Sequence, residues 1–177
     1  MVSVSYKGVA GMYNLYVCKK SNLLCEIDGF VTKCFYPNPF KWKIKGEIFS
    51  RKIFSYISRV YYWIISRGKA CIFYLEDLQG ELIHTSYVIP KCSKFTFLDT
   101  HDYEIGPCFT YEKYRGQGIY GKMLKYISGY IGEDCTNFYV LVRPENESSI
   151  KGMEKSGYKL CGQADKSKWL KVYKKLS

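Results

Sequence analysis

Hydrophobic residues recur along this chain at two spacings, and the spacing predicts the type of each element. The strongest helical pattern covers residues 46–67, where apolar side chains three and four positions apart form one broad stripe. Arg51, Lys52, Ser55 and Arg59 fall mostly away from that stripe. We therefore predict a helix packed on a sheet, with a membrane-surface helix as the alternative because its other face is basic. The stripe consists of Ile48, Phe49, Ile53, Phe54, Ile57, Val60, Tyr61, Ile64 and Ile65.

The helical spacing returns twice in the second half of the chain. Residues 119–131 carry apolar side chains on one face and predict a second helix. Residues 147–156 predict a shorter helix, with Asn146 as its N-cap and Gly157 after its last turn. Residues 1–45 are the least defined part of the chain, and their strands cannot be paired from the sequence.

Short apolar runs and alternating patterns predict strands on either side of these helices. They cover residues 14–18, 30–36, 69–76, 81–90, 105–111, 138–142, 158–162 and 169–175. Residues 93–100 are a loop or a continuation of the fourth strand. Pro107 belongs at an edge or a bulge because proline donates no ladder hydrogen bond. The unbroken run in 138–142 predicts an interior strand, buried on both faces and parallel to 105–111. We expect one α+β domain over residues 1–177, with a mixed sheet and helices on both faces.

Composition narrows the class of protein. The 177 residues carry a net charge of +11, but the basic residues are dispersed, which favours a basic surface over nucleic-acid binding. No apolar run is long enough to span a membrane and no signal peptide is visible, so we expect a cytoplasmic protein. Eight scattered cysteines without a Cys-x-x-Cys pair, and only two histidines, predict buried reduced thiols and no metal site.

A glycine-containing junction joins the strand at 105–111 to the helix at 119–131. Gly116 and Gly118 have no Cβ, so an anion could approach the main chain at the positive end of the helix dipole. Arg115 and Lys122 add positive charge. The junction therefore predicts a phosphate or diphosphate site, although a glycine turn that merely connects two elements would look the same.

Two segments together resemble the GNAT superfamily of acetyl-CoA-dependent N-acetyltransferases of the bacterial type. Residues 114–124, Tyr-Arg-Gly-Gln-Gly-Ile-Tyr-Gly-Lys-Met-Leu, are similar to the diphosphate loop of that family. Residues 146–158, Asn-Glu-Ser-Ser-Ile-Lys-Gly-Met-Glu-Lys-Ser-Gly-Tyr, are similar to its following helix and turn. The resemblance covers residues 103–160. It implies a mainly antiparallel sheet in which a splayed strand pair forms an acyl-CoA cleft.

The resemblance also implies roles for individual residues. The backbone of 108–110 would hold the pantetheine arm, and one of these amides would polarise the thioester carbonyl. Amides of 116–121 would bind the diphosphate, and Asn146 would contact the cofactor or the tetrahedral centre. The cofactor-binding residues so implied are Cys108, Phe109, Thr110, Arg115, Gly116, Gln117, Gly118, Ile119, Tyr120, Gly121, Asn146 and Ser149.

Two positions depart from the family pattern. Tyr120 stands where a small residue is usual, and we expect its ring to point outward. Met153 stands where many members have the tyrosine that protonates the leaving thiolate, and methionine cannot donate a proton. We expect Met153 to be a core residue. The general acid is then another tyrosine, a water molecule, or not needed.

A general base is required because the acceptor ammonium must lose a proton before it attacks. Glu104 is the first candidate, acting directly or through water, with Asp102 and His101 as reserves. We expect His84, in the middle of a strand, to be a hydrogen-bonded sheet histidine rather than a cleft residue. Cys108 is a poor candidate nucleophile because no histidine lies near it in the chain.

The expected activity is transfer of acetyl from acetyl-CoA to a primary amine by direct attack. An amino sugar of surface-polysaccharide biosynthesis is the preferred acceptor, and a protein or polyamine amine is the rival. A GNAT-fold module that binds acyl-CoA without turnover is the alternative of another class. A homodimer is left open.

Overall fold

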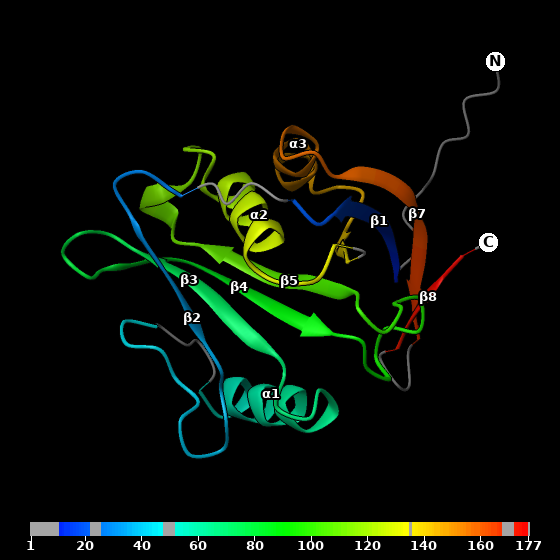
Figure 1. The fold of residues 1–177 in the computed structure, drawn as a ribbon, viewed down its shortest axis with the longest axis horizontal. Helices are drawn as coiled ribbons and strands as arrows, with labels where there is room; N and C mark the ends of the chain where they lie inside the picture. The colour runs from blue at the N-terminus through cyan, green and yellow to red at the C-terminus, as the bar shows by residue number, and fades with distance from the viewer. Residues whose placement is uncertain (1–10, 22–25, 48–51, 135, 168–171, 177) are drawn as a thin grey trace.

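The computed structural model describes residues 11–21, 26–47, 52–134, 136–167 and 172–176, and its strands join in a single eight-stranded sheet (Figure 1). The order across the sheet is β2-β3-β4-β5-β6-β1-β7-β8. β5 and β6 pair in parallel and every other neighbouring pair is antiparallel. The strands are β1 Met12–Lys19, β2 Val31–Phe35, β3 Cys71–Glu76, β4 Leu82–Pro90, β5 Tyr103–Thr110, β6 Asn137–Val142, β7 Lys159–Lys166 and β8 Tyr173–Lys175.

The helices cover both faces of this sheet. α2 (Ile119–Tyr130) and α3 (Glu147–Lys155) lie on one face and α1 (Lys52–Ile65) on the other (Figure 1). The α2 side holds the larger apolar cluster, and a second cluster around Ile89, Phe95 and Leu98 lies apart from it. This arrangement confirms the predicted α+β fold with a mixed sheet.

The boundaries of α2, α3 and most strands agree with the hydrophobic pattern, but two predicted boundaries were wrong. Gly46 lies in a turn outside α1, and β7 extends to Lys166, beyond its predicted end at residue 162. Asn146 caps α3, accepting a hydrogen bond from the Ser149 amide at 3.3 Å, as predicted. The segment 93–100 is a loop, with one bridge from Phe95 to Tyr173. The predicted final strand began at residue 169, and its first part, 169–171, lies outside the described residues.

The two N-terminal strands lie far apart in the sheet. β1 lies between β6 and β7, whereas β2 pairs only with β3. β6 is therefore interior, as predicted, but the prediction that both its faces are buried was only half right. Phe138, Val140 and Val142 are buried, while the alternate residues are only partly covered. β1 pairs with the edge of β6 that faces away from β5, a pairing that could not be predicted from the sequence.

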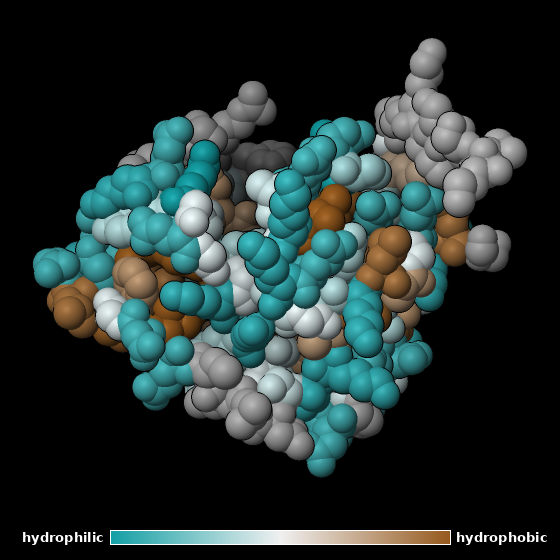
Figure 2. All heavy atoms as spheres, turned by 90° about the horizontal axis from the view of Figure 1, so that it is seen from above, coloured by the Kyte–Doolittle hydropathy of each residue, from teal (hydrophilic) through white to brown (hydrophobic). Residues whose placement is uncertain are grey.

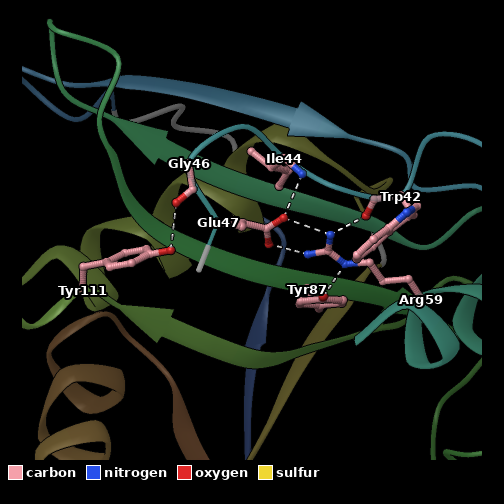
Figure 3. A network of polar contacts seen from close by, with 7 residues as sticks. All are labelled: Trp42, Ile44, Gly46, Glu47, Arg59, Tyr87 and Tyr111. Atoms are coloured by element: carbon pink, nitrogen blue, oxygen red, sulfur yellow. Dashed lines mark hydrogen bonds and ion pairs between the residues drawn. The ribbon is translucent and has the colours of Figure 1, made fainter. Parts of the chain in front are cut away.

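The predicted orientation of α1 was wrong, because Arg59 is only 1% exposed whereas Ile57 and Ile64 are 57% and 60% exposed. The guanidinium of Arg59 is fully engaged (Figure 3): it pairs with both carboxylate oxygens of Glu47 and donates to the Trp42 carbonyl and to Tyr87 Oη. This set of partners makes burial of a charged face tolerable. Residues 48–51 of the predicted helix lie outside the described residues.

β5 and β6 separate soon after they meet. They pair only at Tyr103–Phe138 and Glu104–Tyr139, so the predicted splayed strand pair is confirmed. On the other edge of β5 the register with β4 shifts between Ser86 and Val88, which places Pro107 in a bulge as predicted. The split leaves one edge of residues 105–110 without a neighbouring strand.

No helix within the described ranges combines the length and apolar character needed to cross a membrane. The six described cysteines are free thiols. Among all the described residues, no three His, Cys, Asp or Glu side chains are grouped so that they could hold a metal ion.

Candidate functional site

A cavity of about 920 Å³ opens where β5 and β6 part. β5 residues 105–110 form one wall and β6 residues 140–143 the facing wall. The loop 114–118, the first two turns of α2 and one side of α3 along its whole length complete the lining. The cavity therefore follows the split between the strands and reaches the N-terminus of α2.

The first turn of α2 offers main-chain donors to this cavity. Gly116 and Gly118 have φ values of +77° and +72°, and a Cβ on either would meet nothing within 4 Å. The first intrahelical bond runs from Lys122 N to Gly118 O, and the N-cap residue Gly118 has no side chain to cap the amides that precede it. These amides and the helix dipole suit an anion.

Six basic side chains line the cavity, and the described lining residues include no carboxylate. They are Arg115, Lys122, Lys125, Arg143, Lys151 and Lys155. Figure 2 looks down on the face that bears α2 and α3, and hydrophilic side chains cover most of it. The lysines of α2 and α3 recur at helical spacing, a signal that sequence analysis could have used. Charges dispersed in the sequence thus converge on one cleft, which favours a polyanionic ligand.

Gly121 contributes close packing rather than an open approach. A Cβ at this position would lie 2.5 Å from Ser156 Oγ and 3.0 Å from the Gly152 carbonyl oxygen. The first turn of α2 therefore packs directly against the second half of α3, which fixes the α2 N-terminus beside that helix.

We expect Gly121→Ala to push α3 away from α2 and lower the free energy of unfolding by about 1–3 kcal/mol, the usual cost of overpacking. Urea denaturation would measure the loss. Gly129→Ala in the last turn of the same helix is the control: the higher helix propensity of alanine should leave stability there unchanged or raise it. An equal loss at Gly129 would show that the α2–α3 contact is not the cause.

Of the predictions for Tyr120 and Met153, one was wrong and one is confirmed. The prediction that the Tyr120 ring points outward was wrong: the ring lines the cavity and lies 6.4 Å from the His84 ring. A Cβ on Gly152 would lie 3.1 Å from Tyr120 Cδ1, so Gly152 leaves room for the ring. Burial raises the pKa of Tyr120 well above its ordinary value, so its phenol stays protonated at neutral pH. Met153 is completely buried in the core, as predicted.

A chain of buried polar side chains runs along the floor formed by β4 and β5. Ser86 Oγ donates to Cys108 Sγ at 3.2 Å, and 2.7 Å contacts join His84 Nε2 to Ser86 and His84 Nδ1 to Thr110 Oγ1. Burial lowers the pKa of His84 to about 3, so the ring is neutral and both nitrogens are satisfied. This confirms His84 as a hydrogen-bonded sheet histidine.

The same chain changes the reason for doubting a Cys108 nucleophile. A histidine does lie close in space, although none lies near in the sequence. Burial nevertheless raises the pKa of Cys108 to about 12, so the reactive thiolate is disfavoured.

Glu104 lies behind the cavity wall rather than in it. Its side chain is 5% exposed, and no hydrogen bond reaches its buried Oε2 from the described residues. Burial raises the pKa of this carboxyl to about 8, with a partly opposing effect from Lys94. A Cβ on Gly106, which lines the cavity, would lie 2.7 Å from Glu104 Oε1. Only a glycine therefore separates the carboxylate from the cavity.

The two reserve bases are placed differently. Asp102 is buried and accepts hydrogen bonds from the Asn137 amide and side chain and from the Asp99 amide, which ties the starts of β5 and β6 together. His101 is half exposed and lies 3.4 Å from Glu133. Neither residue lines the cavity.

All the cofactor-binding residues implied by the resemblance line the cavity except Gln117. Tyr13, Lys125 and Arg143 line it too and were missed, because they come from β1, the later turns of α2 and the end of β6. Only the three-dimensional arrangement brings those segments together.

No protein-family model and no curated protein matches the sequence. Solved structures match the fold. An acetyltransferase of the GNAT family from Colwellia psychrerythraea superposes with a TM-score of 0.55 at 13% identity, over 86% of this chain and 53% of that one. A functionally unknown conserved protein from Staphylococcus epidermidis gives 0.53 at 11% identity, over 86% and 59%. A GNAT-family structure from Novosphingobium aromaticivorans gives 0.51 at 11%, over 86% and 61%. The chain thus has a GNAT-like fold and spans little more than half the length of these structures.

Proposed function

We propose that this chain, whose fold is GNAT-like, transfers the acetyl group of acetyl-CoA to a primary amine by direct attack. One observation carries the proposal: six basic side chains, with no carboxylate among the described lining residues, surround a cavity that begins where β5 and β6 part. Coenzyme A combines several phosphates with a long amide-containing arm. The basic end of the cavity, with its main-chain amides, suits the phosphates, and the unpaired edge of β5 suits the arm.

The pantetheine arm would lie beside β5 like an added strand. Among the described residues, 105–110 have no strand partner on the side facing β6, so their main-chain groups could pair with the arm's amides. Arg115 Nε already donates to the Thr110 carbonyl at 3.1 Å, so the arm's contacts would fall on the remaining groups of Cys108 and Phe109. The thioester would then lie near the closed end of the split, next to Gly106 and Glu104.

Glu104 is the proposed general base. Its carboxylate would take a proton from the acceptor ammonium, directly or through one water molecule. The neutral amine then attacks the thioester carbonyl carbon, the carbon–sulfur bond breaks, and the thiolate leaves with the electron pair. Tyr120, a neutral phenol in the cavity wall, is the proposed donor that protonates the thiolate. The second proton lost by the nitrogen would restore the phenol, and the proton on Glu104 would pass to solvent. The acceptor we favour is an amino sugar, because a basic cleft would also attract a nucleotide-linked sugar.

A Gly118→Asp variant tests the binding half of the proposal. A carboxylate and a strained left-handed φ at the start of α2 should weaken acetyl-CoA binding at least ~10-fold, because the anion site would carry a like charge. Isothermal titration calorimetry measures the dissociation constant. Gly29→Asp is the matched control, since Gly29 has a φ of +79° with nothing within 4 Å of a Cβ and does not line the cavity. Equal affinity in both variants would overturn the phosphate assignment.

A second candidate function is an acyl-CoA-binding module without turnover. The buried Met153, which cannot act as an acid, favours it. A thiol-release assay over a panel of amino sugars, polyamines and lysine peptides separates the two. Acetyl-CoA binding with no amine-dependent thiol release across the panel would select the module.

A further inference from the structure

α1 turns polar side chains toward the sheet and apolar side chains toward solvent. Arg59 and Ser66, seven positions apart, are only 1% and 4% exposed. Ile57, Tyr61 and Ile64 have the i, i+4, i+7 spacing of one helix face, and they are 57%, 44% and 60% exposed. We call the surface formed by these three residues the outer α1 face. It lies on the opposite side of the sheet from α2 and α3 (Figure 1).

Aromatic rings border the outer α1 face. Tyr56 and Trp63 are each 37% exposed, and the Tyr56 ring packs edge-on against Trp42 with 5.4 Å between the ring centres. A contiguous apolar patch of this kind marks an interaction site, whereas single exposed apolar residues do not. Isoleucine flanked by tyrosine and tryptophan is typical of a helix that lies in the interface of a bilayer, where amphipathic rings are favoured.

Basic side chains flank the same face. Exposed basic residues lie at both ends of α1, namely Lys41, Lys43 and Lys45 before it and Arg67 and Lys69 after it. Trp42 holds the first group beside the helix, because its carbonyl accepts a hydrogen bond from Arg59 and its ring packs on Tyr56. Residues 41–69 contain eight lysines and arginines but a single acidic residue, Glu47, which is paired with Arg59. This excess of positive charge suits anionic headgroups and opposes contact with a second copy of the same basic chain.

We propose that the outer α1 face docks on a lipid bilayer that carries anionic headgroups. Ile57, Tyr61 and Ile64 would enter the boundary between headgroups and acyl chains, and Lys43 and Lys45 would meet the headgroup charges. Because α2 and α3 lie on the other face of the sheet, the basic cavity that they line would stay directed to solution. This inference does not depend on acetyl transfer.

Co-flotation of the full chain with lipid vesicles tests the docking. We expect binding to phosphatidylcholine vesicles that contain about 30% phosphatidylserine to be at least ~10-fold tighter than binding to pure phosphatidylcholine, because the basic residues attract only charged lipid. Ile57→Ser with Ile64→Ser should weaken binding to the charged vesicles at least ~10-fold, since two aliphatic side chains are lost from the interface. Leu78→Ser with Leu160→Ser is the matched control and should bind as the parent does. These leucines are 76% and 58% exposed, and both lie outside α1.

A second pair of variants separates the outer α1 face from the cavity, whose basic lining would also attract an anionic surface. Lys43→Glu with Lys45→Glu should weaken binding to the charged vesicles at least ~10-fold. Lys151→Glu with Lys155→Glu makes the same change of net charge at the cavity. It should weaken binding less than about 2-fold, because salt screens charges over about 8 Å and these lysines lie on the far face of the sheet.

Equal binding of charged vesicles by the parent and by Ile57→Ser with Ile64→Ser would overturn the proposal. Equal binding to charged and uncharged vesicles would also overturn it, and so would a greater loss in the Lys151 and Lys155 variant than in the Lys43 and Lys45 variant. A parent that forms dimers in sedimentation equilibrium and does not float with vesicles would assign the face to a second copy instead. Each variant should keep the melting temperature of the parent, because the substituted side chains are exposed.

Discussion

Glu104→Gln should slow acetyl transfer to an added amine by about 10²–10⁴-fold, the usual contribution of a positioned base, while changing the acetyl-CoA dissociation constant by less than about 2-fold. Glutamine keeps the shape of the side chain but cannot accept the ammonium proton. Because Glu104 lies behind Gly106 and outside the basic cavity, cofactor binding should be spared. Steady-state rates and calorimetry on the same preparations measure the two effects.

The pH profile identifies Glu104 as the group responsible. Its pKa is raised to about 8 by burial, and only the deprotonated form is a base, so the parent's rate should climb as pH rises through about 8. The variant's residual rate should lack this step. Glu133→Gln is the control for loss of a carboxylate at an exposed position. Equal rates in Glu104→Gln and the parent would remove Glu104 as the base.

The melting temperature of the Glu104→Gln variant would test whether that variant is folded. A carboxyl whose pKa is raised on folding binds its proton more tightly in the folded state. Its ionisation therefore costs stability as pH rises from its ordinary value through about 8. The variant has no such cost, so we expect its melting temperature to match or exceed that of the parent at pH 9. A lower melting temperature there would mean that the rate loss reflects misfolding.

Arg59→Leu should lower the free energy of unfolding by about 3–5 kcal/mol, because it leaves a buried carboxylate without its partner. Glu47, the Trp42 carbonyl and Tyr87 Oη all lose the donor that they share in the network of Figure 3. Urea denaturation at neutral pH measures the change. The exposed Lys69→Leu variant removes a positive charge next to the same helix and should change stability by less than about 0.5 kcal/mol.

The double variant Arg59→Leu with Glu47→Leu separates the lost pair from lost helix packing. If the cost comes from an unpaired buried charge, removing Glu47 as well should recover much of it. No recovery would instead assign the loss to the hydrogen bonds that Arg59 makes with Trp42 and Tyr87.

The elements could be predicted because each follows from neighbours in the chain. The apolar period gives α2 and α3 almost to the residue, and a side-chain cap and a glycine mark the ends of α3. The split of β5 from β6 and the bulge at Pro107 were also predicted, the first from resemblance and the second from a missing N–H. The prediction failed for α1, where the helical period placed Arg59 on the solvent-exposed face. The period cannot show that Glu47 and Tyr87 bind the guanidinium in the folded chain.

The candidate site likewise has some features that the sequence predicts and others that only the tertiary structure shows. Gly116 and Gly118 predict an anion site from the sequence, because the conformational freedom of glycine is a property of the residue itself. The remaining features depend on contacts between distant segments: the cations of α2, α3 and the end of β6 around one cavity, and His84 joined to Cys108 through Ser86.

The sequence by itself determined where α2 and α3 begin, about where most strands lie, which loop can expose its amides, and that the charge is strongly positive. Those properties depend on local backbone preference and on composition. Only the tertiary structure decided that β1 would lie between β6 and β7, that the Tyr120 ring would line the cavity, and that Glu104 would be buried with a raised pKa. The physical reason is that burial and electrostatic environment are set by residues far apart in the chain, whose approach no local pattern records.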